Sequence, residues 1–518
     1  MQFLRWNERV HRVDDRLAFP TRQRFRNLGH YWEHHSANFF ILTPLWLRYT
    51  LWPLEPAAVL TERLSMTIST LNSLRSFLAI ALLALTNAVT ADAADKLVHA
   101  FRGSDGALPL ALVADSKGNL FGVASTAGTG SNSTCTSLGS ACGTVFELSP
   151  NADGEWKTTV LYNFTGGSDG NSPSDLVIDS AGNLFGVASQ GGNGAGCAYR
   201  NGCGTVFELS PGAPHYSFTV LHAFTGGRDG ALPSYIVRDS AGDLYVTNAS
   251  GGNKQTLCGN GCGTIFRLVP YGTGYKGSTL RVFNWGFNNP EAAAPNGRLT
   301  LDPAGNLYGV AGGGVFNDNW NTSFGTVYEL IPTASGQWKE VVIYDFCPNS
   351  VNCLDGTSPA AGLTFDSQGN LFGSTTAGGQ FGNGVIFELS PSSGAWSYNV
   401  IYNFTGGADG GLPVSPLTLG NDGEFFGTNA SGGNSNCLCG VAFKLQSVSG
   451  AWNLGVLHSF SGGSDGANPN TANGLVLDSL GILYGTTVFG GIETPPCNGL
   501  CGEVYELTES ASATGATP

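Results

Sequence analysis

Seven acidic side chains with one fixed spacing are the residues of this sequence best suited to chemistry. Each stands four positions before a proline, as Asp169 stands before Pro173. A ring of such carboxylates could hold Ca²⁺ or a polyol, because hard cations prefer oxygen ligands. A structural role is favoured, since an Asp followed by Gly caps turn amides without any ligand. The seven residues are Asp105, Asp169, Asp229, Glu291, Asp355, Asp409 and Asp465.

Two tryptophans stand in segments that break the regularity of the chain. Trp285 opens the stretch Trp-Gly-Phe-Asn-Asn-Pro-Glu that ends at Glu291, and Trp320 lies in Phe-Asn-Asp-Asn-Trp-Asn. Indole rings and amides suit stacking and hydrogen bonding to a sugar. They also suit simple packing of neighbouring loops. Trp285, Trp320 and the seven acids are the candidate ligand-binding residues.

No catalytic residue is predicted. The stretch around Ser168 has the Gly-x-Ser-x-Gly pattern of a nucleophile elbow, which requires a strand-to-helix turn. Its position is taken by Arg228 and Ala408 in equivalent segments. Three histidines share one position with tyrosines elsewhere, which favours packed surface aromatics over catalytic bases. They are His99, His222 and His458.

The twelve cysteines fall into six close pairs, none of them before residue 94. Such spacing predicts disulfides that staple loops. A zinc site would need four ligands, so a second pair would have to come from elsewhere. The tightest pair would be strained as a disulfide, and bonding elsewhere or a reduced state stays open for it. The pairs are Cys135/Cys142, Cys197/Cys203, Cys258/Cys262, Cys347/Cys353, Cys437/Cys439 and Cys497/Cys501.

The charge balance argues against nucleic acid as a partner. The 518 residues carry a formal charge of −14, and only 12% are charged, while 75 are glycine. A phosphate-binding surface would have to be local and opposed to the average charge. The hydrophobic content of 42% is sufficient for a large core.

The first 93 residues differ from the rest. Residues 1–65 are rich in Arg and His and lack the glycine-rich pattern, while Met66 opens a segment with Arg75, an apolar run and small residues up to Ala93. That layout is typical of a secretory signal peptide. We expect residues 66–93 to be the signal, translation to start at Met66, and no membrane span to remain after cleavage. Residues 1–65 as a cytoplasmic extension of a signal anchor are the alternative.

A unit of about sixty residues recurs seven times. The line Gly143-Thr-Val-Phe-Glu-Leu148 returns at residues 204, 263, 325, 384, 440 and 502. A turn of the type Asp-Ser-x-Gly-Asn precedes it and is degraded in the last two units, at residues 420 and 478. Each unit contains four short apolar stretches, which in the second unit are 176–178, 184–188, 205–209 and 218–224. Four-stranded units without helices are typical of propeller blades. The fold class is therefore all-β, a seven-bladed β-propeller over residues 94–508 with a flexible tail at 509–518.

The chain ends predict how the ring closes. A lone outer strand at 97–101 precedes the first unit, and the seventh unit stops after its third strand at 503–507. Pairing of these two strands would complete one blade and remove an open sheet edge. An open solenoid is the alternative. In the closed ring the short turns emerge on one face, and the cysteine-bearing and variable loops emerge on the other.

The sequence resembles the GloVer tandem-repeat family, the choice-of-anchor secreted repeat proteins. The resemblance rests on the segment from Gly474 to Gly491 and extends over residues 101–507. It implies a secreted bacterial propeller of undefined activity. The tail from Thr508 to Pro518 departs from relatives that carry a C-terminal anchor, because it has no apolar span.

Together these features predict a secreted, periplasmic or cell-surface propeller without a cofactor. Its expected role is to bind or scaffold an extracellular carbohydrate or protein. A hydrolase or lyase acting on glycans or lactones and a purely structural envelope protein are the alternatives, the former by analogy of fold alone.

Overall fold

The computed structural model describes residues 94–129, 142–192, 197, 201–213, 215–253, 258–284, 292–313, 324–348, 351–491 and 501–508. Residues 1–65, 66–93 and 509–518, to which the sequence assigned an extension, a signal peptide and a tail, lie outside this part of the chain. In the described part the regular structure consists of β-strands and one short 3₁₀ helix, η1 (Gly463–Asp465).

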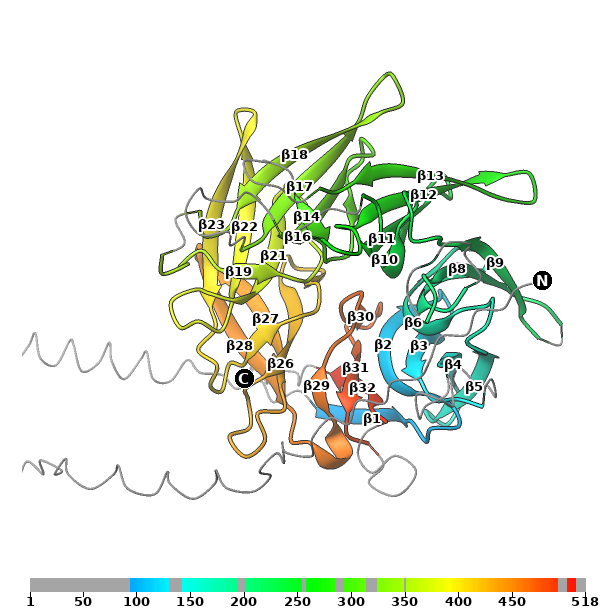
Figure 1. Ribbon diagram of the computed structural model, residues 1–518. Helices are drawn as coiled ribbons and strands as arrows, with labels where there is room; N and C mark the ends of the chain where they lie inside the picture. Colours follow the sequence, from blue (N-terminus) through cyan, green and yellow to red (C-terminus); the bar gives the residue numbers. More distant parts are fainter. Residues whose placement is uncertain are drawn as a thin grey trace, which may run out of the picture. The chain divides into compact units, whose positions relative to one another are not determined.

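The strands form seven antiparallel sheets around a common axis, which confirms the predicted propeller (Figure 1). In the first three blades, four strands follow one another from the innermost to the outermost. Blade 1 is β2 (Ala107–Ala114), β3 (Leu120–Thr126), β4 (Thr144–Pro150) and β5 (Trp156–Asn163). Blade 2 is β6 (Asn171–Ile178), β7 (Leu184–Gln190), β8 (Thr205–Ser210) and β9 (Ser217–Ala223). Blade 3 is β10 (Ala231–Arg238), β11 (Leu244–Ser250), β12 (Thr264–Tyr271) and β13 (Gly274–Val282).

In the other four blades the innermost strand is divided into two short strands that pair with the same neighbour. Blade 4 is β14 (Ala293–Pro295), β15 (Thr300–Leu301), β16 (Leu307–Gly313), β17 (Thr326–Pro332) and β18 (Trp338–Asp345). Blade 5 is β19 (Thr357–Pro359), β20 (Thr364–Phe365), β21 (Leu371–Ala377), β22 (Val385–Ser392) and β23 (Ala395–Asn403). Blade 6 is β24 (Gly411–Pro413), β25 (Thr418–Leu419), β26 (Phe425–Ser431), β27 (Val441–Val448) and β28 (Ala451–Ser459).

Blade 7 is assembled from both ends of the propeller, as predicted. It contains β29 (Ala467–Pro469), β30 (Val476–Leu477), β31 (Leu483–Phe489) and β32 (Glu503–Thr508), and β1 (Ala94–Ala100) is its outermost strand. Leu97 pairs with Tyr505 in the antiparallel ladder between β1 and β32. The ring is therefore closed by the first strand of the described chain.

The innermost strands begin earlier than the sequence predicted. In blade 2 the expected strand covered only residues 176–178, whereas β6 begins at Asn171 and includes Pro173, which pairs with Ala188. A proline is tolerated there because the innermost strand is a sheet edge, where a missing N–H removes no ladder bond. The residue before it, Ser172, has φ of 56° and donates its N–H to the Cys142 carbonyl of the preceding blade at 3.0 Å.

One glycine explains why two sequence markers recur together. Gly143 precedes β4 with φ of 94°, and a Cβ on it would lie 2.6 Å from the Pro173 ring of the next blade. Only glycine allows the blades to approach this closely. The glycine of the Gly-Thr-Val-Phe line and the proline of the acid-proline spacing thus form one contact between blades.

Aromatic pairs build the core between the blades. Phe164 follows β5, is fully buried, and meets Phe207 of the next blade edge to face with ring centroids 5.2 Å apart. Edge-to-face pairs add to the stabilisation from burial alone. An aromatic pair recurs at every blade junction, edge to face in Phe101–Phe146, Phe224–Phe266, Phe283–Tyr328, Phe346–Phe387 and Phe460–Tyr505 and tilted in Phe404–Phe443.

Candidate functional site

The predicted acids accept hydrogen bonds from the turns that follow the outermost strands. Asp169 accepts hydrogen bonds from the Thr165 N–H at 2.7 Å, the Thr165 hydroxyl at 2.6 Å and the Gly167 N–H at 3.2 Å. Its Oδ2 also accepts from the Tyr162 hydroxyl on β5 at 3.0 Å. These contacts use the carboxylate within its own loop. They support turn capping and place Asp169 beside the outermost strand, away from the propeller axis.

Five other acids make the same kind of contacts. Each meets a Tyr or His on the preceding outermost strand at 2.9–3.3 Å and accepts at least one backbone N–H. The partners are His99 for Asp105, His222 for Asp229, Tyr344 for Asp355, Tyr402 for Asp409 and His458 for Asp465. The three histidines therefore hold loops in place, a role that their sequence position as packed aromatics did not reveal.

The same outer side chains touch the next blade. Tyr162 stacks on Phe218 with centroids 3.9 Å apart, and His99 meets the Thr158 hydroxyl at 2.9 Å. Burial acts to raise the pKa of Asp105, but hydrogen bonds from His99 and the Arg102 N–H outweigh it and hold that pKa below its usual value. The network links the acid, the outer strand and the neighbouring blade.

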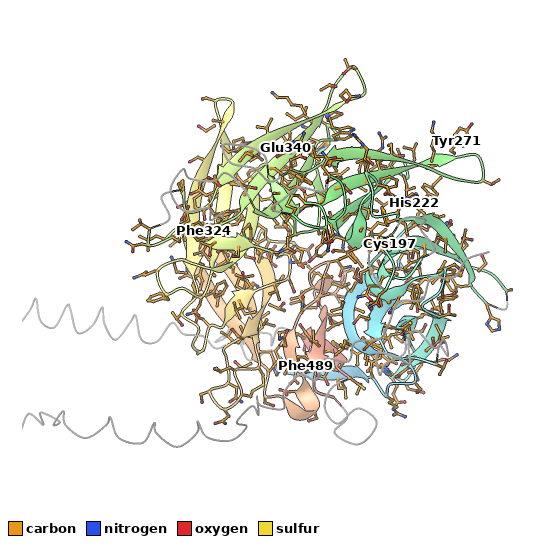
Figure 2. The ribbon with its side chains drawn as sticks, viewed as in Figure 1. Cys197, His222, Tyr271, Phe324, Glu340 and Phe489 are labelled. Carbon is orange, nitrogen blue, oxygen red and sulfur yellow. A yellow bond between two sulfur atoms is a disulfide. The ribbon has the colours of Figure 1, made fainter. Side chains whose placement is uncertain are left out.

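The junction between blades 3 and 4 uses a different pair. Arg281 on β13 occupies the Tyr/His position, and its Nε lies 2.6 Å from Oε2 of Glu340 on β18. Glu340 also accepts the Ala292 N–H at 2.6 Å, and Figure 2 labels it together with His222. Sequence analysis assigned the acid of this junction to Glu291. Glu291, Trp285 and Trp320 lie outside the described residues.

Disulfides hold the loops on the face opposite the short turns. Four of the predicted pairs are bonded, including the tight pair, for which bonding elsewhere had been left open. They are Cys197–Cys203, Cys258–Cys262, Cys347–Cys353 and Cys437–Cys439. Cys142 and Cys501 are disulfide-bonded as well, while Cys135 and Cys497 lie outside the described residues. Oxidised sulfurs are not zinc ligands, because zinc requires thiolates.

In several of these loops the carbonyl of a cysteine accepts a backbone hydrogen bond from the next blade. The Cys203 carbonyl accepts the Leu232 N–H at 3.0 Å, and the Cys262 carbonyl accepts the Ala294 N–H at 2.9 Å. The disulfide therefore restrains the cysteine whose carbonyl binds the following blade. Loop conformation and ring assembly are coupled on this face.

A buried ion pair near the axis was not anticipated. Asp175 on β6 is fully buried and accepts the N–H groups of Leu176 at 2.7 Å and Ile236 at 2.9 Å. Arg298 of blade 4 reaches it with Nη1 at 3.3 Å, so the contact spans blade 3. Burial raises the pKa of Asp175 more than Arg298 and the two amides lower it, and burial beside Asp175 raises the pKa of Tyr235 to about 12.

The patterns that resemble catalytic or metal sites are structural where they are described. Ser168 lies in the turn between β5 and β6 rather than in front of a helix. Within the described residues, no group of three or more His, Cys, Asp or Glu side chains is arranged to hold a metal ion. Over the same residues, no helix has the length and apolar character needed to cross a bilayer.

No curated protein matches the chain. Solved structures similar to it include a luciferin-regenerating enzyme (12% identity, 69% of this chain and 96% of that one, TM-score 0.39) and a protein from Lactobacillus plantarum (13%, 67% and 83%, TM-score 0.41). A gluconolactonase from Xanthomonas campestris is also similar (14%, 72% and 92%, TM-score 0.35).

The family comparison covers most of the chain. The model of the Gloeobacter/Verrucomicrobia repeat matches residues 86–256, 135–349, 197–436 and 325–515 in overlapping copies. Those matches span all seven blades and the strand that closes the ring. The chain therefore belongs to the Gloeobacter/Verrucomicrobia repeat family.

Proposed function

We propose that the protein is an exported propeller whose loop face binds an extracellular carbohydrate or protein. The loop face consists of the loops after the second and fourth strands of each blade, including those closed by the four disulfides. The observation that carries the proposal is a set of exposed apolar side chains on this face, from the loop that follows blade 4 to blade 7. They are Val351, Leu354, Phe381, Leu412, Leu438 and Phe489, each 40–69% exposed.

These side chains are presented by constrained backbone. Val351 lies within the Cys347–Cys353 loop and Leu354 directly follows it, while Leu438 stands between Cys437 and Cys439. Phe489 ends β31 and is labelled in Figure 2. Exposed apolar groups held in a fixed conformation are typical of binding surfaces, because little conformational entropy is lost on association.

Export is part of the same proposal. Every cysteine among the described residues is oxidised, and disulfides persist in secreted and periplasmic proteins but not in a reducing cytosol. The segment from Met66 to Ala93, with its basic residue, apolar run and small residues, supports export. The direct check is the N-terminal sequence of the secreted protein, which we expect to begin near Ala94.

Binding is tested with the secreted full-length product on a glycan array and on extracellular proteins immobilised individually. Phe381→Ser, Leu438→Ser, Trp285→Ala and Trp320→Ala are compared with Tyr271→Ser and Leu480→Ser, which alter apolar residues 72% and 82% exposed in the short turns of the other face. We expect the loop-face variants to lose binding at an unchanged melting temperature, while the two control variants keep it.

The outcome separates binding from catalysis. Each glycan is incubated with the protein and the mixture is analysed for hydrolysed or eliminated products. Binding without turnover supports the proposal. Turnover, or equal loss of binding in loop-face and control variants, contradicts it.

A further inference from the structure

The disulfide between Cys437 and Cys439 differs from the others in its exposure to solvent. Cys437 is the only exposed cysteine in the described part of the chain, while Cys439 is 9% exposed. In the other three disulfides with both cysteines described, every cysteine is buried or half-buried. A thiolate attacks a disulfide at a sulfur that it can reach. Cys437 therefore offers the accessible sulfur.

This disulfide also closes the shortest of the described loops. Its cysteines are two positions apart, compared with four for Cys258–Cys262 and six for Cys347–Cys353. The stabilisation that a disulfide provides by restricting the unfolded chain grows with the length of the loop that it closes. Opening the Cys437–Cys439 bond therefore costs the fold less than opening either of those two.

The turn around this disulfide has hydrogen bonds of its own. The Asn434 carbonyl accepts the N–H of Leu438 at 2.8 Å and that of Cys437 at 3.3 Å. The Asn434 side-chain oxygen accepts the Asn436 N–H at 2.9 Å. None of these bonds involves a sulfur atom, so the turn does not depend on the disulfide. Two thiols in this turn stay close to each other, which favours their return to a disulfide.

Cys439 is anchored on the other side of the bond. Its carbonyl accepts the Asn468 N–H of blade 7 at 2.7 Å, and the next residue, Gly440, donates its N–H to the Gly432 carbonyl at 3.1 Å. The segment after β28 covers its sulfur, since a Cβ on Gly462 would lie 3.4 Å from it. An accessible sulfur that takes the attack and an anchored one that leaves and returns together suit thiol–disulfide exchange.

Leu438 adds an apolar contact at the same point. It stands between the two cysteines and is 56% exposed. Polypeptides that have not completed their folding expose apolar side chains together with their free thiols. A polypeptide dithiol therefore matches this surface better than a small hydrophilic thiol does.

We propose that Cys437–Cys439 is an exchange site that oxidises a dithiol in a reduced polypeptide, its client. A client thiolate forms a bond to Cys437 Sγ, the bond between the two cysteine sulfurs breaks, and Cys439 leaves as a thiolate that takes up a proton. The second client thiolate then attacks the client sulfur of this mixed disulfide and releases Cys437 as a thiolate, which is protonated in turn.

The exchange balances. Two electrons and two protons pass from the client, which gains a disulfide, to the cysteine pair, which becomes two thiols. A small-molecule disulfide such as glutathione disulfide restores the pair by the reverse exchange. The site lies on the loop face, but the exchange does not require the ligand binding proposed for that face.

The first measurement compares the disulfides of the full-length secreted protein. The protein is equilibrated with increasing dithiothreitol, quenched with acid, alkylated and digested, and the peptides that contain each pair are quantified by mass spectrometry. We expect the Cys437–Cys439 bond to open at a dithiothreitol concentration about tenfold lower than the Cys258–Cys262 bond requires. Opening of both bonds at the same concentration overturns the proposal.

The second measurement follows transfer of the disulfide to an apolar synthetic peptide with two cysteines. The wild type should convert an equimolar amount of peptide to its disulfide. The double variant Cys437→Ser/Cys439→Ser should lose transfer, while the matched control Cys258→Ser/Cys262→Ser, which removes a less exposed pair, should keep it. Melting temperatures establish that both variants are folded. No transfer by the wild type, or equal transfer by the two double variants, overturns the proposal.

The order of attack is tested with an excess of a peptide that has a single cysteine. Acid quenching and alkylation trap the mixed disulfide, and mass spectrometry locates it. We expect the peptide on Cys437 and the alkyl group on Cys439. A mixed disulfide on Cys439 contradicts the assigned order of attack.

Discussion

Blades 1 to 3 and blades 4 to 7 differ at the strand nearest the axis. In blades 1 to 3, six positions separate the proline from the Asp of the following turn, and the inner strand is continuous through β2, β6 and β10. In blades 4 to 6 the turn begins seven positions after the proline, with Gly420 in place of the Asp in blade 6. In blade 7 it begins nine positions after the proline, and in all four blades the inner strand is divided in two. One added residue changes the side-chain alternation of a strand, so the ladder is interrupted and then resumed.

The blades also differ in one residue near the end of the inner strand. In blades 4 to 6 it is a threonine that bonds the next blade, whereas blades 1 to 3 have valine there, and Val177 and Val237 are buried in the core between blades. The Asp175–Arg298 pair links the two groups. Blade 7 is divided as well but has Val476 at this position, so the side-chain bonds between blades follow the threonine and not the divided strand alone.

The largest expected effect comes from breaking the link between the two groups. Arg298→Met leaves Asp175 buried without its cationic partner, and removing one member of a buried pair costs about 3–5 kcal/mol. Lys96→Met is the control, because Lys96 is 53% exposed and pairs with Glu506 at the surface, where a pair is worth about 1 kcal/mol or less. Denaturant unfolding of both variants measures the difference. Equal losses of unfolding free energy in the two variants would contradict a stabilising role for the Asp175–Arg298 pair.

A second prediction concerns the first residue of the third strand, which differs between blade 2 and blade 7. Thr205 of blade 2 donates to the Asp169 carbonyl at 3.1 Å, but blade 7 has Glu503 at this position, 1% exposed. Burial, with Asp465 and Asp95 nearby, raises the pKa of Glu503 from 4.5 to about 8. A carboxyl whose folded pKa is raised costs no stability below pH 4.5, and the cost grows between pH 4.5 and 8 as the unfolded chain ionises first.

Glu503→Thr is therefore expected to stabilise the protein at pH 9 by about 2 kcal/mol. This is less than the free energy that corresponds to the whole pKa difference, because the surroundings of a buried charge relax. Near pH 4 the gain from removing the charge should vanish. Thermal melts at both pH values check this. A gain that does not depend on pH would show that Glu503 ionises normally in the folded protein.

The smallest expected effect tests the threonine bonds themselves. Thr364→Val removes the hydroxyl that bonds the Leu417 carbonyl and should cost about 1–2 kcal/mol. The reciprocal change, Val113→Thr, introduces a hydroxyl at a position where the structure has no bond between blades, so it should not stabilise the protein. Denaturant unfolding measures both. A Thr364→Val variant as stable as the wild type would show that the threonine bonds between blades do not stabilise the protein.

Repetition made most of the fold predictable. The seven recurrences of the Gly-Thr-Val-Phe line, the lone strand before the first unit and the missing strand after the last one required a closed seven-bladed ring, and β1 pairs with β32 accordingly. The cysteine spacing predicted the bonded pairs, because short loops bring their ends together. The division of the inner strands was missed, since one extra residue in a glycine-rich segment has no distinct pattern.

The candidate site was less predictable, because its contacts are distant in sequence. Asp175 has no pattern around it that marks a site, and its partner Arg298 lies 123 positions away on a blade that is not its neighbour. Glu340 was hidden for the same reason, since Arg281 reaches it across a blade junction. Six of the seven acids before the prolines are described, and all six accept hydrogen bonds from the turns beside the outer strands; this direction depends on how the loop leaves that strand.

Ring closure by β1 is the claim on which the loop face and the packing of the blades around the axis both depend. Hydrogen exchange measured by mass spectrometry on the full chain tests it in the peptide covering residues 94–101. The account predicts protection of this peptide comparable to that of the outermost strands β5 and β9, because its amides bond β32. Exchange of residues 94–101 at the rate of an unstructured segment, with β5 and β9 protected, would contradict it.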